Sequence, residues 1–443
     1  MLKILHVPYT YHPDPVGGTE IYVEQLVDAL RARGVNSVIA APGKTRLTYT
    51  WRDTCVERLA APDAVRAVDQ LYGEGDESAA RAFGALLDTH APQVAHLHAF
   101  TRIVSARFAL QARARAIPVV FTYHTPTVSC LRSGLMLWGR EPCDGVLEVD
   151  RCTCCRLHSL GLPIPLATVV ARTPAPLRAW GAQFQGGVWT GLRMRDLVAR
   201  QHDAVRGLMN EVDAVVALCE WTRQLLIKNK VSSAKIVVAP HGLTIENQEP
   251  HVARLDARQP DTLRVVTLGR LERIKGVDLL VRALAQIPNL QITLDIYGII
   301  QSEKETPFAR ELRAEIAQDA RIHLLPPVPH AQVISLLRQY DVLAVPSQWF
   351  ETGPLVVLEA FAAHIPVIGS NLGGIAEKVA DGVNGLLVSP LKVTAWRDAL
   401  QRLAQDRAWY ERLRANVRLP RTMDAVAQEM HALYESLVAK ARA

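Results

Sequence analysis

Residues 342–359 read VLAVPSQWFETGPLVVLE, in which an apolar run is followed by a loop and then by a second apolar segment. The run Val342–Pro346 has the length and the β-branched content of a buried strand. Pro354 suits the first turn of a helix, where the N–H group that proline lacks has no partner to lose. The stretch therefore predicts a strand, a loop and a helix, the unit that builds parallel sheets covered by helices.

The same alternation of short β-rich runs and longer segments of helical period continues along the chain. Residues 246–262 are polar and rich in Arg and Pro, so they predict a linker between two sets of runs. The first set predicts strands at Lys3–Pro8, Ser37–Ala41, Val94–His98, Val119–Tyr123, Ala214–Leu218 and Ile236–Ala239. The second set predicts strands at Arg264–Leu268, Gln291–Tyr297, Ile322–Leu325, Val342–Pro346, Pro366–Gly369 and Gly385–Val388.

Length and periodicity together predict two domains. The chain has 443 residues, about three times the length of a common single domain. We expect an α/β protein of two doubly wound, Rossmann-like domains that face each other across a cleft. Residues 1–245 would form the first domain and residues 246–420 the second. Ligands of such sheets bind at the carboxyl ends of the strands, so functional residues are expected on loops that follow strands.

Composition narrows the class of protein. Hydrophobic residues make up 49% and charged residues 21% of the chain, which is typical of globular proteins. No run approaches the roughly 20 apolar residues of a membrane-spanning helix, and the first residues lack a signal-peptide cleavage site. We therefore expect a cytoplasmic protein. The net charge of +6 favours phosphates or acidic lipid headgroups as partners, whereas no basic stripe with interleaved aromatic residues indicates nucleic-acid binding.

Two glutamates flank the expected helix start. Glu351 lies in the loop, and Glu359 lies on the helix, on a different face from the apolar Val356 and Phe361. The first turn of the helix offers free N–H groups and a partial positive charge to a diphosphate. Carboxylates beside it can accept hydrogen bonds from sugar hydroxyls. Taken alone, one solvated glutamate and one helix-surface glutamate would explain the same spacing.

A second motif, GRLERIKG at residues 269–276, directly follows a predicted strand. Gly269 lets the backbone approach a ligand, and Arg270 and Lys275 can neutralise a pyrophosphate leaving group. A surface loop with ordinary cations is the alternative. The chain contains no Asp-x-Asp motif, the usual chelate for Mg²⁺ or Mn²⁺ on nucleotide sugars. Side-chain cations are therefore expected to stabilise the leaving group without a catalytic metal.

The first domain offers glycines and histidines at strand ends. Gly17 and Gly18 precede the first long helix, where paired glycines form either an anion cradle or a plain tight turn. His124 directly follows a strand, a position from which an imidazole points toward the cleft. Of His96 and His98 at the end of an earlier strand, we expect one to face the cleft and the other to be buried.

The order and spacing of these residues resembles that of the retaining glycosyltransferases of family 4, which have the GT-B fold. The matching positions are Gly17-Gly18, His124, Arg270, Lys275 and Glu351–Glu359. The resemblance covers nearly the whole chain, and Trp349–Leu355 is similar to a variant found in bacterial polysaccharide enzymes. Gly353 and Pro354 stand where the frequent form has Phe-Gly, so the backbone amides that touch the donor sugar are left open.

The resemblance implies a role for each matched residue. Arg270 and Lys275 would hold the donor diphosphate, and Glu359 would bind the ribose hydroxyls. Glu351 would contact the transferred sugar, and His124 would hydrogen-bond that sugar near the reacting carbon. The other residues of the implied site on the donor phosphate and acceptor side are Gly17, Gly18, Gly269, Pro354 and Leu355.

The resemblance also implies an activity. A sugar would move from a nucleotide diphosphate sugar onto a glycan or lipid-linked acceptor, with retention of the anomeric configuration. The departing phosphate would help to deprotonate the acceptor, so that the enzyme acts by positioning and charge stabilisation. Residues 421–443 are implied to form a helix that crosses back to the first domain.

Four cysteines lie in an expected insertion at about residues 127–210 and have the spacing Cys-x12-Cys-x8-Cys-x2-Cys. They are Cys130, Cys143, Cys152 and Cys155, with Cys154 inside the last pair. A Cys-x2-Cys pair is typical of zinc sites, and four thiolates complete a closed structural site. Four reduced thiols in a loop are the alternative. A catalytic zinc is not expected, because four thiolates leave no open position.

The rest of the insertion is rich in arginine. Residues 160–206 contain six arginines and two interleaved tryptophans against two aspartates. The segment predicts either a contact with an anionic membrane at the inner face of the cell, where a lipid-linked acceptor would lie, or packed helices with solvated arginines.

Two other function classes stay open. An epimerase of nucleotide sugars or a glycogen-type phosphorylase would use the same two-domain fold. The epimerase would need carboxylates placed differently, and we find no candidate for the pyridoxal lysine of a phosphorylase. A pseudo-transferase that only binds its donor is the non-enzymatic alternative. The joint presence of Arg270, Lys275, Glu351 and Glu359 argues against it.

Overall fold

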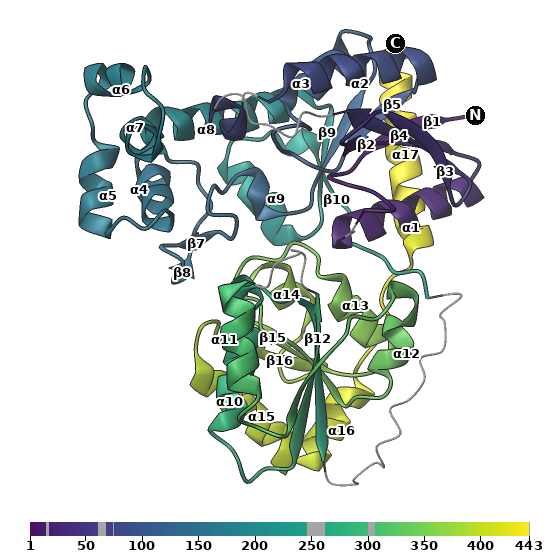
Figure 1. The fold of residues 1–443 in the computed structure, drawn as a ribbon. Helices are drawn as coiled ribbons and strands as arrows, with labels where there is room; N and C mark the ends of the chain where they lie inside the picture. The colour runs from purple at the N-terminus through teal and green to yellow at the C-terminus, as the bar shows by residue number, and fades with distance from the viewer. Residues whose placement is uncertain (15–16, 61–67, 74, 246–261, 300–305, 443) are drawn as a thin grey trace. The chain divides into compact units, whose positions relative to one another are not determined.

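A computed structural model describes residues 1–14, 17–60, 68–73, 75–245, 262–299 and 306–442. The expected linker at residues 246–262 lies outside the described residues, apart from Thr262. The chain divides into two compact units (Figure 1): unit 1 comprises Met1–Pro240 and Met423–Ala443, and unit 2 comprises His241–Thr422. The boundaries expected from the sequence were 245/246 and 420/421.

Unit 1 is built on an eight-stranded sheet with the order β10-β9-β6-β5-β1-β2-β4-β3. Every neighbouring pair is parallel except β3 and β4. The strands are β1 (Lys3–Val7), β2 (Asn36–Gly43), β3 (Leu47–Trp51), β4 (Thr54–Ala60), β5 (Val94–Leu97), β6 (Val119–Tyr123), β9 (Ala214–Ala217) and β10 (Ile236–Val238).

The helices of unit 1 fall into a group around the sheet and a lobe of short helices (Figure 1). The first group is α1 (Gly18–Ala32), α2 (Glu77–His90), α3 (Ala106–Arg113), α8 (Met194–Glu211), α9 (Glu220–Lys228) and α17 (Met423–Arg442). The lobe, residues 126–193, carries β7 (Met136–Leu137), β8 (Glu141–Pro142), α4 (Val149–Ser159), α5 (Ile164–Ala171), α6 (Ala175–Gly181) and α7 (Gly187–Leu192). Short 3-10 turns are η1 (Val68–Tyr72), η2 (Pro126–Val128) and η3 (Ser233–Lys235).

The last helix, α17, is part of the core of unit 1. Its apolar face packs with α1 on one face of the sheet, and Met430 and Tyr434 are fully buried there beside Tyr22 and Leu26. Since these side chains recur at helical spacing, a single stripe of α17 supplies the contact. Unit 1 is therefore completed by a helix that follows unit 2 in the sequence.

Unit 2 has a six-stranded, all-parallel sheet with the order β13-β12-β11-β14-β15-β16. Its strands are β11 (Leu263–Arg270), β12 (Ile292–Ile299), β13 (Ile322–Leu325), β14 (Val342–Val345), β15 (Val367–Ser370) and β16 (Gly385–Val388). Its helices are α10 (Val277–Ala285), α11 (Pro307–Ile316), α12 (Val333–Leu337), α13 (Leu355–Ala362), α14 (Gly373–Lys378), α15 (Val393–Gln405) and α16 (Arg407–Ala415), with 3-10 turns η4 (Arg273–Lys275) and η5 (His330–Gln332).

The strands expected from the sequence are all present, and their ends shift by no more than two residues. The antiparallel hairpin of β3 and β4 was not expected. Its turn places Arg52 and Asp53 at positive φ, +43° and +59°, positions that Asn-Gly or Asp-Gly normally occupies in two-residue hairpins. The usual turn signal is therefore absent from the sequence.

In the part of the chain that the structure describes, no helix combines the length and the apolar character that crossing a membrane requires.

A substitution in α17 tests its place in the core. Met430→Ala should lower the free energy of unfolding of unit 1 by about 2–5 kcal/mol, because it opens a cavity at a fully buried position. The exposed Ser436 of the same helix supplies the control Ser436→Ala, for which a change within about 0.5 kcal/mol is expected. Urea denaturation measures both. Equal changes in unfolding free energy for the two variants would contradict the packing of α17 in the core of unit 1.

Candidate functional site

The loops that follow β11 and β14 meet backbone to backbone in unit 2. Gly276 ends the η4 turn with φ of +70°, and a Cβ atom there would lie 2.0 Å from the carbonyl oxygen of Pro346. Only glycine tolerates both the left-handed backbone and this approach. The sequence motif around Arg270 and Lys275 is thereby held against the loop that carries Glu351.

A third loop, at the start of α14, supports the same stretch from its other side. The N–H of Gly374 donates to the carbonyl oxygen of Glu351 at 2.6 Å, and a Cβ atom on Gly374 would lie 2.5 Å from the carbonyl oxygen of Thr352. This element was not predicted from the sequence. Its signal is a glycine pair, Gly373-Gly374, at the start of a helix, as in Gly17-Gly18.

Glu351 is the best-anchored carboxylate of this edge. Its Oε1 atom accepts hydrogen bonds from Lys275 Nζ at 2.5 Å, Trp349 Nε1 at 2.7 Å and Ser347 Oγ at 2.9 Å. Lys275 Nζ also lies 5.0 Å from the centre of the Trp349 ring. Among the described residues no hydrogen bond reaches Oε2, so that oxygen is available to a ligand hydroxyl.

The Glu351 carboxyl group favours its charged form although the side chain is mostly buried. Burial works to raise the pKa of this carboxyl group, but the Lys275 cation and the three hydrogen bonds outweigh burial, and the pKa lies below its ordinary value. The side chain keeps 13% of its surface exposed and that of Lys275 keeps 22%. A charged, oriented carboxylate beside a cation suits the recognition of sugar hydroxyls and phosphate.

Glu359 is buried, contrary to the expectation that it lies on a different face of the helix from the buried side chains. Its side chain accepts a hydrogen bond from His330 Nε2 at 2.8 Å, whereas Val356 is only half-buried. The partner explains the burial, because a carboxylate enters a protein interior when it is hydrogen-bonded. His330 comes from η5 and was not predicted as a site residue.

Pro354 precedes α13 as its N-cap residue, and Leu355 opens the helix, so the expected first turn starts one residue later. Gly353 has a packing role here. A Cβ atom on it would lie 2.8 Å from Nδ1 of the buried His241, which is hydrogen-bonded to the Gly353 carbonyl oxygen at 2.8 Å. Burial and the nearby Lys378 lower the pKa of His241 to about 3, so its ring is neutral at physiological pH.

The other two predicted residues of this edge lie at the end of β11. Arg270 forms an ion pair with Glu272, with 3.0 Å between Nη1 and Oε1. Gly269 has a φ of +149°, and no atom lies within 4 Å of a Cβ built on it. The backbone at Gly269 is therefore open to close approach, as the sequence suggested.

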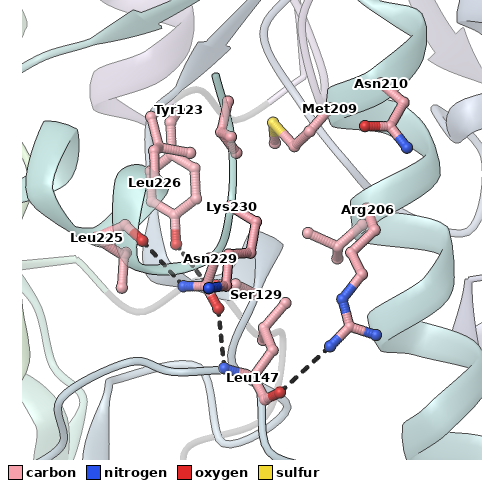
Figure 2. Close-up of a pocket in the computed structure, with 12 residues that line it drawn as sticks. Tyr123, Ser129, Leu147, Arg206, Met209, Asn210, Leu225, Leu226, Asn229 and Lys230 are labelled. Atoms are coloured by element: carbon pink, nitrogen blue, oxygen red, sulfur yellow. Dashed lines mark hydrogen bonds between the residues drawn. The ribbon is translucent and has the colours of Figure 1, made fainter. Parts of the chain in front are cut away.

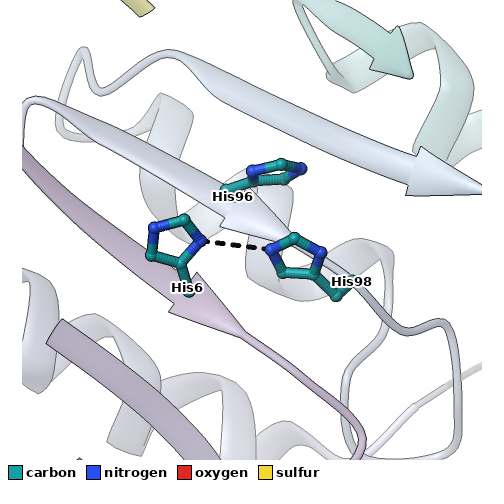
Figure 3. Close-up of side chains that lie close together, drawn as sticks. All are labelled: His6, His96 and His98. Atoms are coloured by element: carbon teal, nitrogen blue, oxygen red, sulfur yellow. Dashed lines mark hydrogen bonds between the residues drawn. The ribbon is translucent and has the colours of Figure 1, made fainter. Parts of the chain in front are cut away.

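In unit 1, His124 ends a chain of three imidazoles. His6 Nδ1 lies 3.2 Å from His98 Nε2, and His98 Nδ1 lies 3.0 Å from His124 Nε2. Figure 3 shows His6 and His98 joined at the ends of neighbouring strands. His98 is fully enclosed, and burial lowers its pKa well below the ordinary value. A neutral His98 has one donor and one acceptor nitrogen, so its tautomer and that of His124 depend on each other.

The expectation that one of His96 and His98 faces a cleft is wrong, because both are buried. His96 is hydrogen-bonded to Tyr434 Oη and Thr122 Oγ1, both at 2.7 Å. These partners satisfy both ring nitrogens, so the ring is held in the core.

Gly17 and Gly18 begin α1 as expected, but their surroundings are partly occupied. Gly17 is the N-cap residue, and its N–H donates to Glu20 Oε2 at 2.9 Å. Burial raises the pKa of Glu20. The first turn of α1 is thus capped by its own side chain, which fits the tight-turn interpretation of the glycine pair better than a wide anion cradle.

The four cysteines of the predicted metal site lie apart from these groups, in the lobe, where they surround one small cavity.

Comparison with solved structures identifies the class of fold. Sucrose-phosphate synthase from Thermosynechococcus elongatus has a TM-score of 0.66 at 22% identity, over 99% of this chain and 100% of that one. Anabaena HepE in complex with UDP-glucose has a TM-score of 0.64 at 16% identity, over 98% and 100%. UDP-GlcNAc 2-epimerase from Neisseria meningitidis has a TM-score of 0.54 at 12% identity, over 98% of this chain and 100% of that one. These likenesses define the fold as GT-B.

Comparison with family models then identifies the family. The model described as Glycosyltransferase Family 4 matches residues 16–170, and the model described as Glycosyl transferases group 1 matches residues 256–419. Since the two matches cover both halves, the chain belongs to the family 4 glycosyltransferases.

Curated relatives carry one recurring name. D-inositol 3-phosphate glycosyltransferase of Nocardia farcinica is 34% identical over 211 residues, which is 45% of this chain and 47% of the relative. The protein of the same name from Corynebacterium aurimucosum is 31% identical over 204 residues, 43% of this chain and 48% of the relative. The chain thus spans about half the length of the curated relatives it matches.

Replacing Lys275 by methionine tests the charge arrangement. In the wild type, the lowered pKa of Glu351 contributes stability at neutral pH that is lost as pH falls through that pKa. Without the cation, burial should raise the pKa of Glu351 above its value in the unfolded chain. The folded state then loses stability as the pH rises and the buried carboxyl group ionises. Lys275→Met should therefore cost about 3 kcal/mol of unfolding free energy at neutral pH and less in acid. Denaturant unfolding at both pH values measures the difference.

The matched control is Arg273→Met on the same turn. Arg273 forms an ion pair with Glu311 in which both side chains are more than half exposed, so a cost below about 1 kcal/mol is expected at either pH. A cost of Lys275→Met that does not change with pH would show that Glu351 does not depend on this cation.

Proposed function

We propose that the protein transfers a sugar from a nucleotide diphosphate sugar onto an acceptor. The observation that carries the proposal is the Lys275–Glu351 pair, held by three converging loops at the carboxyl edge of the unit 2 sheet. This edge is where doubly wound sheets bind nucleotides. The glycosyltransferase names of the curated relatives agree with that chemistry.

In the proposed donor complex, Arg270 and Lys275 neutralise the diphosphate. Lys275 then contacts Glu351 and a phosphate oxygen together, which its three N–H donors allow. Glu351 accepts from a hydroxyl of the transferred sugar through Oε2, and Glu359 with His330 recognises the ribose. The bound cations stabilise the charge that develops on the leaving group as the bond to the sugar breaks.

We propose retention of configuration at the sugar carbon. The bond from that carbon to the phosphate oxygen breaks, and the acceptor oxygen forms its bond on the same face. The acceptor proton passes to the departing phosphate oxygen, so the atoms balance without a protein base. His124, oriented by His98, donates or accepts one hydrogen bond on the transferred sugar. The absence of an Asp-x-Asp motif from the sequence supports catalysis by side-chain cations instead of a metal.

The acceptor is proposed to bind in unit 1. A cavity of about 590 Å³ lies between the lobe and the loop that follows β5, and Phe100, Arg102, Thr127 and Thr190 are among its lining residues. Its volume is within the range of small-molecule sites. Thr127 is only three residues from His124, so an acceptor held there would lie on the side of the unit that carries the predicted sugar contact.

The lobe also supports a contact with membrane lipid, which a lipid-linked acceptor would require. Seven large apolar side chains between residues 160 and 188 are exposed: Leu160, Leu166, Val169, Leu177, Trp180, Phe184 and Val188. Trp180 and Phe184 form an aromatic group with Trp189, with ring centres 4.7–5.1 Å apart. Aromatic and aliphatic side chains on short surface helices are typical of segments that lie in the membrane interface.

The arginines of residues 160–206 contribute less than their number suggests. Five of them form ion pairs with aspartates: Arg178 with Asp196, Arg193 and Arg200 with Asp69, Arg195 with Asp150, and Arg206 with Asp203. The membrane proposal therefore rests on apolar burial, with Arg172 as an exposed cation at the end of α5.

The fold does not separate the proposed transferase from an epimerase, because UDP-GlcNAc 2-epimerase shares it. The curated names favour the transferase. Chemically the two differ in whether the sugar leaves its nucleotide.

Turnover tests the donor site. Glu351→Gln and Lys275→Ala should each lower kcat/KM at least about a hundredfold, the size of losing one contact made in the transition state. Calorimetry against UDP, GDP, ADP and CMP, with and without EDTA, first identifies the donor base. Release of the nucleoside diphosphate from the matching sugar donors then measures turnover.

Arg397 of α15, which forms an ion pair with the neighbouring Asp398, provides the control Arg397→Gln, which should leave turnover unchanged. Near-normal turnover in both site variants would reject the assignment. A changed sugar still attached to its nucleotide would indicate an epimerase, and a donor that binds without turning over would indicate a pseudo-transferase. Loss of activity in EDTA that Mg²⁺ or Mn²⁺ restores would reject metal-independent catalysis.

Vesicle binding tests the lobe. Phe184→Asp and Val188→Asp should each weaken binding to phosphatidylglycerol vesicles about tenfold or more, since burying one large apolar side chain contributes about 1.5–3 kcal/mol. Leu110 of α3 is 50% exposed, so Leu110→Asp is the matched control and should bind as the wild type does. Co-sedimentation measures all three. Equal binding by every variant would show that the lobe does not enter the interface.

A further inference from the structure

Four thiols of the lobe converge on one cavity that the proposed transfer does not use. Cys130 follows η2, Cys143 follows β8, and Cys152 and Cys155 lie one turn apart on α4. All four line a cavity of about 30 Å³. A space of this size accommodates a single ion or water molecule, not an organic ligand.

All four cysteines are free thiols, and all four residues are half-buried. The thiolate is the form of cysteine that binds metal, so the cavity offers four ligands to one ion.

The charge around the cavity supports the same conclusion. Four thiolates around a divalent ion leave two negative charges, and Arg132, Arg151 and Arg156 all line the cavity. Groups of this kind around the ligands raise the affinity of metal sites.

We propose that Cys130, Cys143, Cys152 and Cys155 bind one structural zinc ion. Zinc is the metal that closed tetrahedral sites of four thiolates select. Binding would draw the sulfurs to about 2.3 Å from the ion. Because the site uses only lobe residues, the proposal does not depend on the transfer activity.

Two other clusters already have three ligand atoms within 4.8 Å of one another, among the residues described here. They are His6, His96 and His98, and Cys55, Glu57 and His90. Their ligand atoms are already hydrogen-bonded: His96 to Tyr434 and Thr122, and Glu57 to His90 within the cluster and to Thr48 outside it. A metal would have to displace these hydrogen bonds, whereas the four cysteines face one shared cavity.

The metal would join segments that are already attached to the core of unit 1. Asn229, which follows α9, accepts from the N–H of Leu147 at 2.9 Å (Figure 2). Its side-chain amide also donates to the carbonyl oxygen of Gly145 at 3.0 Å. Ser129 Oγ lies 2.6 Å from the hydroxyl of Tyr123, the residue before His124. The zinc would therefore fix α4 to the loops on either side of it and stiffen the approach to His124.

Metal analysis of the whole protein tests the proposal. Chain purified without chelator should contain one zinc per molecule, and replacement by Co²⁺ should produce the visible absorption of tetrahedral cobalt thiolate. Cys152→Ser and Cys155→Ser should each weaken zinc binding at least about tenfold. Since such variants can fail to fold, protection of four thiols from a thiol reagent, lost on adding a zinc chelator, provides a readout on the wild type.

Two thiols outside the cavity are the controls. Cys154 is buried in the apolar core of the lobe beside Leu157, and Cys55 belongs to a competing cluster. Cys154→Ser and Cys55→Ser should both keep the zinc. Wild-type protein that takes up no zinc when it is supplied would overturn the proposal, as would disulfides between the four cysteines. So would zinc that survives Cys152→Ser and is lost in Cys55→Ser.

Discussion

Unit 2 depends on the close approach of loop backbones around Glu351. Gly276 meets the carbonyl group of Pro346, and Gly374 meets that of Thr352, at separations that exclude a side chain. Peptide groups packed this closely leave the loops little freedom, so the Lys275–Glu351 pair forms on a rigid base. Preorganised charge of this kind stabilises a developing anion without a cost of rearrangement.

Most of the architecture follows from local patterns in the sequence. Buried parallel strands are near-continuous apolar runs, and β14 (Val342–Val345) is of this kind. Its parallel neighbour β11 (Leu263–Arg270) has an apolar centre. Because parallel strands place the loops after them on one edge, the meeting of Lys275 and Glu351 follows from strand periodicity alone. The β3–β4 hairpin was not predicted, because its partly polar strands are joined by Arg52 and Asp53, which are not a usual turn sequence.

The missed site residues depend on contacts between distant segments. His330 reaches Glu359 over 29 positions, and His98 lies 92 positions from its neighbour His6 in the histidine chain. Spacing in the sequence carries no information about such pairs. The same limit applies to the arginines of residues 160–206, because a count of charges does not show that Asp69 pairs with both Arg193 and Arg200. Local signals find the strand ends, and tertiary packing decides which side chains meet there.

The place of α17 has a consequence for synthesis on the ribosome. Unit 2 is one continuous segment, residues 241–422, whereas unit 1 needs α17, which follows unit 2 in the sequence, to cover Tyr22 and Leu26. Domains fold as units while the chain emerges, so unit 2 can finish first. The first part of the protein keeps an apolar face uncovered until residues 423–442 have been made. Loss of α17 would therefore damage unit 1, although most of that unit lies before unit 2 in the sequence.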